Sequence, residues 1–169
     1  MEAYEAILSR RSIRLYEPGE VSEEMVNKLL AAAMSAPSAG NQQPWEFIVI
    51  RERAKMLAIR EVHPHAPMLD KAAVAIVVCG NKSREKYKNY WVLDCSAATQ
   101  NVLLAAHALG LGAVWLGVYP NEERLVPISR LLGLPGEVVP LSIISIGYPA
   151  EEKPAADRFD AGRIHAEKW

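Results

Sequence analysis

Three arginines and a serine fall within five residues near the start of the sequence, in the segment RRSIR at residues 10–14. This is the strongest local concentration of positive charge in the chain. Arginine suits phosphate because its planar guanidinium donates two parallel hydrogen bonds. Ile13, Leu15 and Tyr16 interleave with the charges, so an extended segment would point alternate residues inward. The segment predicts a phosphate site, with a solvated run of charges as the alternative.

A second polar segment, APSAGNQQPW at residues 36–45, joins an expected helix to an expected strand. Residues 37–40 permit a turn through which a helix cannot continue. Residues 41–43 then supply three side-chain amides, each of which can donate and accept hydrogen bonds. We interpret the segment as a binding loop. A plain connector between the two elements is the alternative.

A glycine closes the apolar segment GLGAVWLG at residues 110–117. Gly117 falls late in the strand expected here, where a missing side chain costs packing and often means that something approaches the backbone. The first glycines follow a helix and precede a strand, which is the reverse of the order in a dinucleotide-binding loop. The segment therefore does not predict a Rossmann fold.

The elements that would position these segments follow from hydrophobic periodicity and capping residues. Helices are expected at residues 1–9, from Ser22 to Met34, and at residues 53–60, 90–109 and 121–132. Strands are expected at residues 45–50, 74–79 and 140–146, and a tight turn followed by a strand is expected within residues 110–117. The segment VAIVVC at residues 74–79 is continuously apolar, which predicts a strand buried on both faces. The order indicates a layered α/β or α+β domain.

Composition excludes several classes of protein. The chain has 169 residues, of which 50% are hydrophobic, and a net charge of −1. This length predicts one domain with a substantial core, and the balanced charge gives no field that would attract nucleic acid. No apolar run is long enough to span a bilayer, and no signal peptide opens the sequence. We therefore expect a cytoplasmic protein.

The histidines and cysteines form no metal-binding pattern. His63 and His65 lie in a proline-rich segment without a third ligand nearby, which predicts a solvated loop. His107, on the longest helix, is expected to be a core or boundary residue. Cys79 and Cys95 are not spaced as a CxxC pair, so buried free thiols are expected, with a single disulfide between them as the alternative.

Four segments, taken together and in this order, resemble the nitroreductase family of FMN-dependent oxidoreductases, particularly its short members. They are Arg10-Arg11-Ser12-Ile13-Arg14, residues 36–45, residues 110–117 and Ile146-Gly147-Tyr148-Pro149. The resemblance covers nearly the whole chain and implies a single domain over residues 1–169. The implied fold is α+β, with three layers and a central mixed β-sheet flanked by helices. It also implies an intertwined homodimer with two FMN sites at the subunit interface.

The resemblance assigns FMN contacts to four groups of residues. They are Arg10, Arg11, Ser12 and Arg14 in one subunit; Pro37, Ser38, Ala39, Asn41 and Gln43 from the other subunit; Leu116 and Gly117 along the flavin edge near N5; and Arg158 at the phosphate, with Lys153 or Arg163 as substitutes. One departure is Ala66-Pro67-Met68, where many relatives place a polar residue facing the pyrimidine. Arg14 or Lys71 would then stabilise the anionic reduced flavin alone.

The implied activity passes hydride from NAD(P)H through FMN to a nitroaromatic, a quinone or a related small molecule by a ping-pong mechanism. The flavin supplies the chemistry, and the sequence shows no Ser-His-Asp set or paired carboxylates that would act in its place. Neither nucleic acid nor membrane is an expected partner. Three alternatives stay open: a flavin carrier without turnover, an FMN enzyme that uses ferredoxin, reduces enoates or catalyses a dehydrogenation, and a structural domain that binds no flavin.

Overall fold

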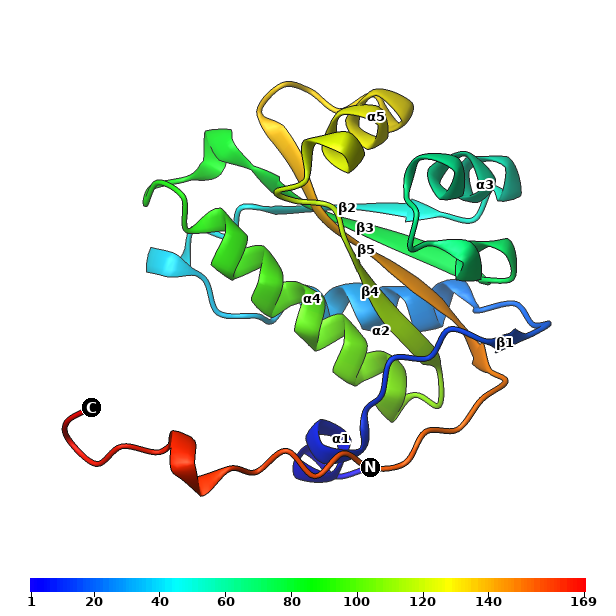
Figure 1. Ribbon diagram of the computed structural model, residues 1–169. Coiled ribbons are helices and arrows are strands. Elements are labelled where there is room, and N and C mark those ends of the chain that lie inside the picture. The colour runs from blue at the N-terminus through cyan, green and yellow to red at the C-terminus, as the bar shows by residue number, and fades with distance from the viewer.

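The computed structural model describes residues 1–169 and places one β-sheet between two layers of helices (Figure 1). The α-helices are α1 (Ala3–Ser9), α2 (Glu23–Met34), α3 (Arg53–Val62), α4 (Trp91–Ala108) and α5 (Glu122–Leu132). The strands are β1 (Tyr16–Glu17), β2 (Trp45–Ile50), β3 (Val74–Asn81), β4 (Gly112–Gly117) and β5 (Val138–Pro149). Short 3-10 turns are η1 (Ala39–Asn41), η2 (Pro67–Asp70), η3 (Lys82–Arg84) and η4 (Ala161–Arg163). Every predicted helix and strand is confirmed, and β1 is an additional short strand.

The long strand β5 organises the sheet. It pairs with β1, β3 and β4, while β2 pairs with the far side of β3. All four pairings are antiparallel, so the prediction of a mixed sheet was wrong for the named strands. The physical reason is that β5 lies between β3 and β4 and runs opposite to both. The one parallel contact is an isolated bridge between Ser12 and Ala113.

Strand β3 divides the core into two halves, as its continuous apolar sequence predicts. The half that packs on α2 and α4 contains Val74, Ile76 and Val78. The half that packs on α3, α5 and η2 contains Ala75, Val77 and Cys79. Helices therefore cover both faces of the sheet, and the three-layer α+β architecture is confirmed (Figure 1).

Two sequence signals explain the local structure of the half of the core that packs on α2 and α4. Ser22 caps α2, because its hydroxyl accepts a hydrogen bond from the Met25 N–H at 3.2 Å. Helix α4 is apolar on most of its surface and packs directly against α2.

Cys79 and Cys95 are buried and free, as predicted, and burial raises the pKa of Cys79 to about 12. No helix combines the length and the apolar character needed to cross a membrane.

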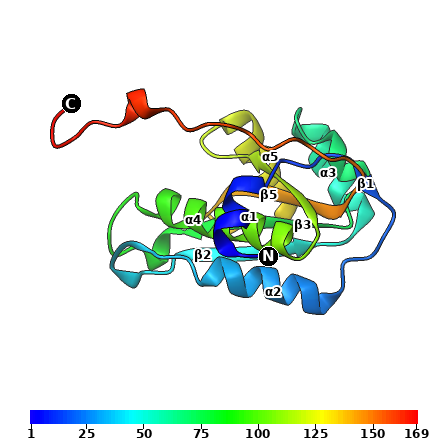
Figure 2. The ribbon, with the colours of Figure 1, turned by 90° about the horizontal axis from the view of Figure 1, so that it is seen from below.

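The two ends of the chain run outside these layers (Figure 2). Residues 10–15 form an arm beside β4, and residues from 150 onward form an extended tail that passes α1. Leu15 was predicted to point inward but is 58% exposed, whereas Tyr16 is buried. Tyr16 turns inward because its hydroxyl donates to backbone carbonyls, which include that of Ser145 in β5.

Candidate functional site

The arm is held against the sheet by backbone contacts. After α1 ends at Ser9, the Ile13 N–H donates to the Ala113 carbonyl of β4 at 3.0 Å. The Ser9 hydroxyl oxygen also lies 2.7 Å from Nε2 of His107 in α4. His107 is partly buried, as predicted for a boundary residue. These contacts fix the position from which the arginines of the arm project.

Three arginines from the arm and the tail form what we call the arginine cluster: Arg10, Arg11 and Arg158. They line one hollow of about 580 Å³ together with the exposed apolar residues of α1. Burial lowers the pKa of Arg10, and the charges of Arg11 and Arg158 lower it further. None of the three arginines makes an ion pair. The cluster therefore carries three positive charges without an ion pair, and Asp157 is the one acidic residue that lines the same hollow.

One nitrogen of the Arg11 guanidinium also lacks a hydrogen-bond partner. Its Nε donates to the Pro154 carbonyl at 2.8 Å, and its Nη1 donates to the Arg10 carbonyl at 2.6 Å. Its Nη2 is buried without a hydrogen-bond partner. A buried donor left unpaired is costly, so this atom marks a place where an acceptor would be stabilised.

The tail reaches the cluster because polar contacts tie it to the arm. Glu151 accepts from the Arg14 N–H at 2.5 Å, and Lys153 donates to the Ser12 carbonyl at 2.7 Å. The Arg14 N–H holds the pKa of Glu151 below its ordinary value, and Lys153 lowers it further. Lys153 also pairs with Glu151, whereas Arg163 pairs with Asp160 at 3.0 Å. Of the three tail cations considered from sequence, only Arg158 lies in the arginine cluster.

A second hollow, of about 450 Å³, lies beside the end of β4 and is lined by Arg14, Leu116 and Gly117. No acidic side chain lines it. Nothing lies within 4 Å of where a Cβ of Gly117 would be, so the backbone here is open to an approaching group. The structure thus brings together Arg14, Leu116 and Gly117, which the sequence had placed in two separate segments.

The prediction for His63 was wrong. It was expected in a solvated loop, but it is only 2% exposed, and its Nε2 lies 2.9 Å from the Gly117 carbonyl. Nη1 of Arg124, in the first turn of α5, donates to the same carbonyl at 3.0 Å. Sequence reasoning missed both residues, because nothing near them in the chain indicates contact with Gly117. His65, next to His63, is exposed as predicted.

The loop at residues 36–45, which we call the amide loop, is held rigidly by a residue that the sequence did not single out. Asp94 of α4 is 4% exposed and accepts from the Ala39 N–H at 2.9 Å and from Nε2 of Gln42 at 2.6 Å. The Gln42 side-chain oxygen accepts from the N–H groups of Lys86 and Tyr87. Gln42 is thus fully used inside the protein, although its amide was a candidate for ligand binding.

Other residues of the amide loop stay accessible. Pro37, Asn41 and Gln43 are exposed, and the φ angles of Asn41 and Gln43 are positive, at 54° and 47°. Such angles are uncommon for residues other than glycine and persist only where surrounding contacts impose them. Ser38 supplies one such contact by accepting from the Gln43 N–H at 3.0 Å. The loop therefore presents its polar side chains in a fixed arrangement.

The amide loop and the arginine cluster lie apart within one chain. The loop, at η1, and helix α1 occupy different parts of the molecule in both views (Figures 1 and 2). No residue of the loop lines the hollow of the arginine cluster or the hollow at Gly117. The predicted site residues therefore form two separate groups in a single chain.

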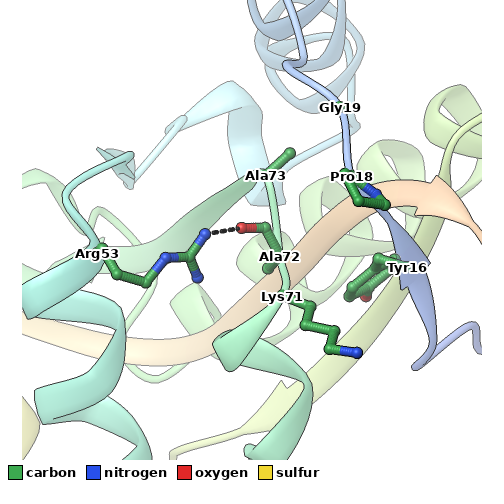
Figure 3. A pocket seen from close by; sticks show the side chains of 7 residues that line it. All are labelled: Tyr16, Pro18, Gly19, Arg53, Lys71, Ala72 and Ala73. Atoms are coloured by element: carbon green, nitrogen blue, oxygen red, sulfur yellow. Dashed lines mark hydrogen bonds between the residues drawn. The ribbon is translucent and has the colours of Figure 1, made fainter.

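A third hollow lies beside Tyr16 and Lys71 and is shown in Figure 3. Arg53 lines it but is already engaged, because its guanidinium donates to the carbonyls of Leu69 and Ala72 at 2.6 and 2.8 Å. The Lys71 amino group makes no ion pair and also lines an adjoining hollow with Arg14. Lys71 and Arg14 are thus two cations without an ion pair that line one hollow, together with Asp70.

Comparison with known proteins agrees with these observations. The sequence profile described as "Nitroreductase family" matches two overlapping segments, residues 7–66 and 53–148. A relative from Methanothermobacter thermautotrophicus, provisionally named NADH dehydrogenase/NAD(P)H nitroreductase, is 54% identical over 100% of this chain and 88% of its own length.

Solved structures show the same fold. One from Parabacteroides distasonis with the same provisional name has a TM-score of 0.95 and 41% identity, covering 99% of this chain and 98% of that one. One from Desulfovibrio desulfuricans, provisionally named a nitroreductase and solved with FMN, has a TM-score of 0.87 and 33% identity, covering 100% of this chain and 98% of that one. The chain therefore belongs to the nitroreductase family.

Proposed function

We propose that this protein is an FMN-dependent oxidoreductase that takes electrons from NAD(P)H and delivers them to a small acceptor such as a nitroaromatic or a quinone. The two half-reactions use one site in turn. The single observation that carries the proposal is the arginine cluster of the arm and tail, whose three guanidinium groups share one hollow without an ion pair. Family membership, and the FMN bound in the related structure from Desulfovibrio desulfuricans, support it.

The arginine cluster fits the phosphate of FMN. A phosphate oxygen is the acceptor that the buried Nη2 of Arg11 lacks. Arg10 and Arg158 add charge from two other positions around the same hollow. A bound dianion would also offset the mutual repulsion of the guanidinium groups. We therefore assign Arg10, Arg11 and Arg158 to the phosphate, with Ser12 next to them on the arm.

The hollow at Gly117 fits the flavin ring. Leu116 and Met68 offer an apolar surface, Gly117 leaves its backbone open, and Arg14 supplies a positive charge. When bound, FMN accepts a hydride from reduced nicotinamide and passes it to the oxidised acceptor. Arg14 and Lys71 would favour a negative charge on the ring through their own positive charges. They would act without a polar partner at residues 66–68, where this chain has Ala66-Pro67-Met68. No side-chain nucleophile or acid/base pair is needed for this role.

We place the amide loop over the flavin of a second subunit in a homodimer. This arrangement would join the two groups of site residues that one chain keeps apart. Pro37, Ser38, Ala39, Asn41 and Gln43 would then contact the partner's cofactor. Exposed apolar residues support a subunit interface, among them Ile7 of α1 and Phe159 of the tail, which is 80% exposed.

The decisive experiment is reduction of the purified holoprotein under anaerobic conditions. We expect a yellow protein whose flavin absorbance bleaches with NADH or NADPH and returns when a nitroaromatic or a quinone is added. Flavin that bleaches with neither nicotinamide would contradict the proposed donor. Reduced ferredoxin and an enoate would then be tried, and a flavin that none of them reduces or reoxidises would indicate a carrier. A colourless protein that binds no FMN in a titration would refute the proposal.

A further inference from the structure

Two side chains from different elements converge on one backbone carbonyl. His63 follows α3 and Arg124 lies in the first turn of α5, yet Nε2 of the first and Nη1 of the second lie 2.9 and 3.0 Å from the Gly117 oxygen. Just beyond Gly117, the N–H groups of Val118 and Tyr119 both donate to the Leu141 carbonyl, so the regular pairing of β4 with β5 ends here. Two side chains therefore contact the Gly117 carbonyl at the last position where β4 pairs with β5.

The imidazole of His63 is present as one defined tautomer. Its Nδ1 lies 3.3 Å from the backbone nitrogen of His65, which can only donate, so Nδ1 is the acceptor. The proton of the neutral ring is therefore on Nε2, from which it is donated to the Gly117 carbonyl. A second proton on Nδ1 would face the His65 N–H and break that contact.

The surroundings of His63 oppose a positive charge. Burial lowers its pKa, and Arg124 and His65 lower it further, although the bond to the Gly117 carbonyl raises it. Arg14 lines the same hollow, and no carboxylate does. Arg124 makes no ion pair, so its charge also remains uncompensated. The neutral form of His63 supplies the hydrogen bond without adding to this charge.

Gly117 needs such support, because it has no side chain and nothing packs where a Cβ would be. We propose that His63 and Arg124 are positioning residues, which fix the Gly117 carbonyl and thereby orient the Leu116–Gly117 backbone against the flavin edge. This inference rests on the FMN site proposed above. It assigns a role to two residues that do not belong to the four segments shared with the family.

The test compares four variants with the wild type: His63→Phe, His63→Gln, Arg124→Met and the exposed control Arg130→Met. Two properties are measured, the Kd for FMN and the carbonyl ¹³C shift of Gly117 in the FMN-free protein. We expect His63→Phe and Arg124→Met to move the shift and to raise Kd about tenfold, the ratio that the loss of one hydrogen bond produces. Glutamine retains a donor near the Nε2 position, so His63→Gln should restore most of the affinity. Arg130→Met should match the wild type.

A pH series separates positioning from general structural support. In the wild type, acid adds a cation at His63, which favours the reduced flavin and raises its midpoint potential. Glutamine does not titrate, so the potential of the wild type should exceed that of His63→Gln increasingly at pH values below the ordinary histidine value of about 6.5, in the range to which the lowered pKa of His63 moves its protonation. A difference that stays constant with pH would show that His63 lies too far from the flavin to act on it.

The outcomes are distinguishable. Wild-type protein that binds no FMN would overturn the proposed function together with this inference. Wild-type protein that binds FMN, alongside variants with an unchanged Kd and an unchanged Gly117 shift, would overturn the inference alone. If His63→Phe fails to fold, the result is decided by Arg124→Met, which changes a half-buried side chain, and by His63→Gln.

Discussion

The arginine cluster and the amide loop are both polar, yet the fold uses their hydrogen-bonding groups in opposite ways. In the amide loop, Asp94 and Gln42 satisfy each other and the neighbouring backbone N–H groups. In the arginine cluster, three guanidinium groups share a hollow without an ion pair, and Nη2 of Arg11 has no partner. Polar groups that are satisfied internally shape a site, whereas those left free are available to a ligand.

The largest effect should come from Asp94, on which the order of the amide loop depends. Asp94→Ala removes a buried acceptor and leaves the Ala39 N–H and the Gln42 amide without their partner. We expect the free energy of unfolding to fall by about 3 kcal/mol, measured by urea denaturation. The control is Asp70→Ala, which removes an exposed ion pair with Arg60 and should cost less than about 1 kcal/mol. Equal losses would show that the loop does not depend on Asp94.

The arginine cluster should give the reverse result, a loss of binding without a loss of stability. Arg10→Ala removes one charge-assisted contact to phosphate, so we expect FMN binding to weaken by about 1.5 to 3 kcal/mol, or roughly 10- to 150-fold in Kd. Unfolding by urea should change little, because Arg10 forms no ion pair in the protein. Unchanged FMN affinity would mean that the cluster is only a solvated face.

Two glycines extend the comparison to the backbone. Gly40 in the amide loop has a φ of +53°, and a Cβ there would overlap the Tyr87 ring, so Gly40→Ala should destabilise the fold by about 1 to 2 kcal/mol. Gly117→Ala has open space and should leave stability within about 0.5 kcal/mol while weakening FMN binding. Thermal unfolding and FMN titration of both variants test this. Matching profiles for the two variants would contradict the assigned roles.

The smallest effect concerns pH. Burial lowers the pKa of His63 and of His107, and the charges of Arg10 and Arg11 also lower that of His107. As the pH falls below the ordinary histidine value of about 6.5, the unfolded chain binds protons more readily than the folded one. The stability present above that pH is therefore lost progressively on acidification.

Thermal midpoints between pH 5.5 and 7.5 should show this loss, and replacing both histidines with glutamine should flatten it. The depressed pKa of Glu151 acts in a lower pH range, below the ordinary carboxylate value. FMN should reduce the slope, because a bound phosphate would offset the charges near His107. A slope that persists without the two histidines would assign the effect to other groups.

Most of the fold could be predicted from local patterns. The Ser22 cap, the continuous apolar strand β3 and the apolar helix α4 are all properties of neighbouring residues. Strand direction was not predictable in the same way, because the position of β5 between β3 and β4 depends on pairings between residues 25 or more positions apart. The predicted mixed sheet failed for that reason.

The residues of the candidate site also divide into those that local sequence could predict and those that it could not. Arg10, Arg11 and Gly117 stood out because their types are unusual for their local setting. His63 did not, since its hydrogen bond to Gly117 spans 54 positions, and the prolines nearby suggested a surface loop. Asp94 lies in a largely apolar helix, where nothing in the sequence indicates that its carboxylate faces the amide loop. Such pairings depend on tertiary structure.

The central place of β5 also bears on synthesis at the ribosome. Three strands pair with it, so until residues 138–149 leave the exit tunnel, β3 and β4 lack the neighbour that lies between them. Their apolar faces and unpaired backbone edges stay exposed for most of translation, which is the condition that favours aggregation and chaperone binding. Nascent chains stalled before residue 138 should therefore be sensitive to protease, and resistance should arise abruptly once β5 has emerged.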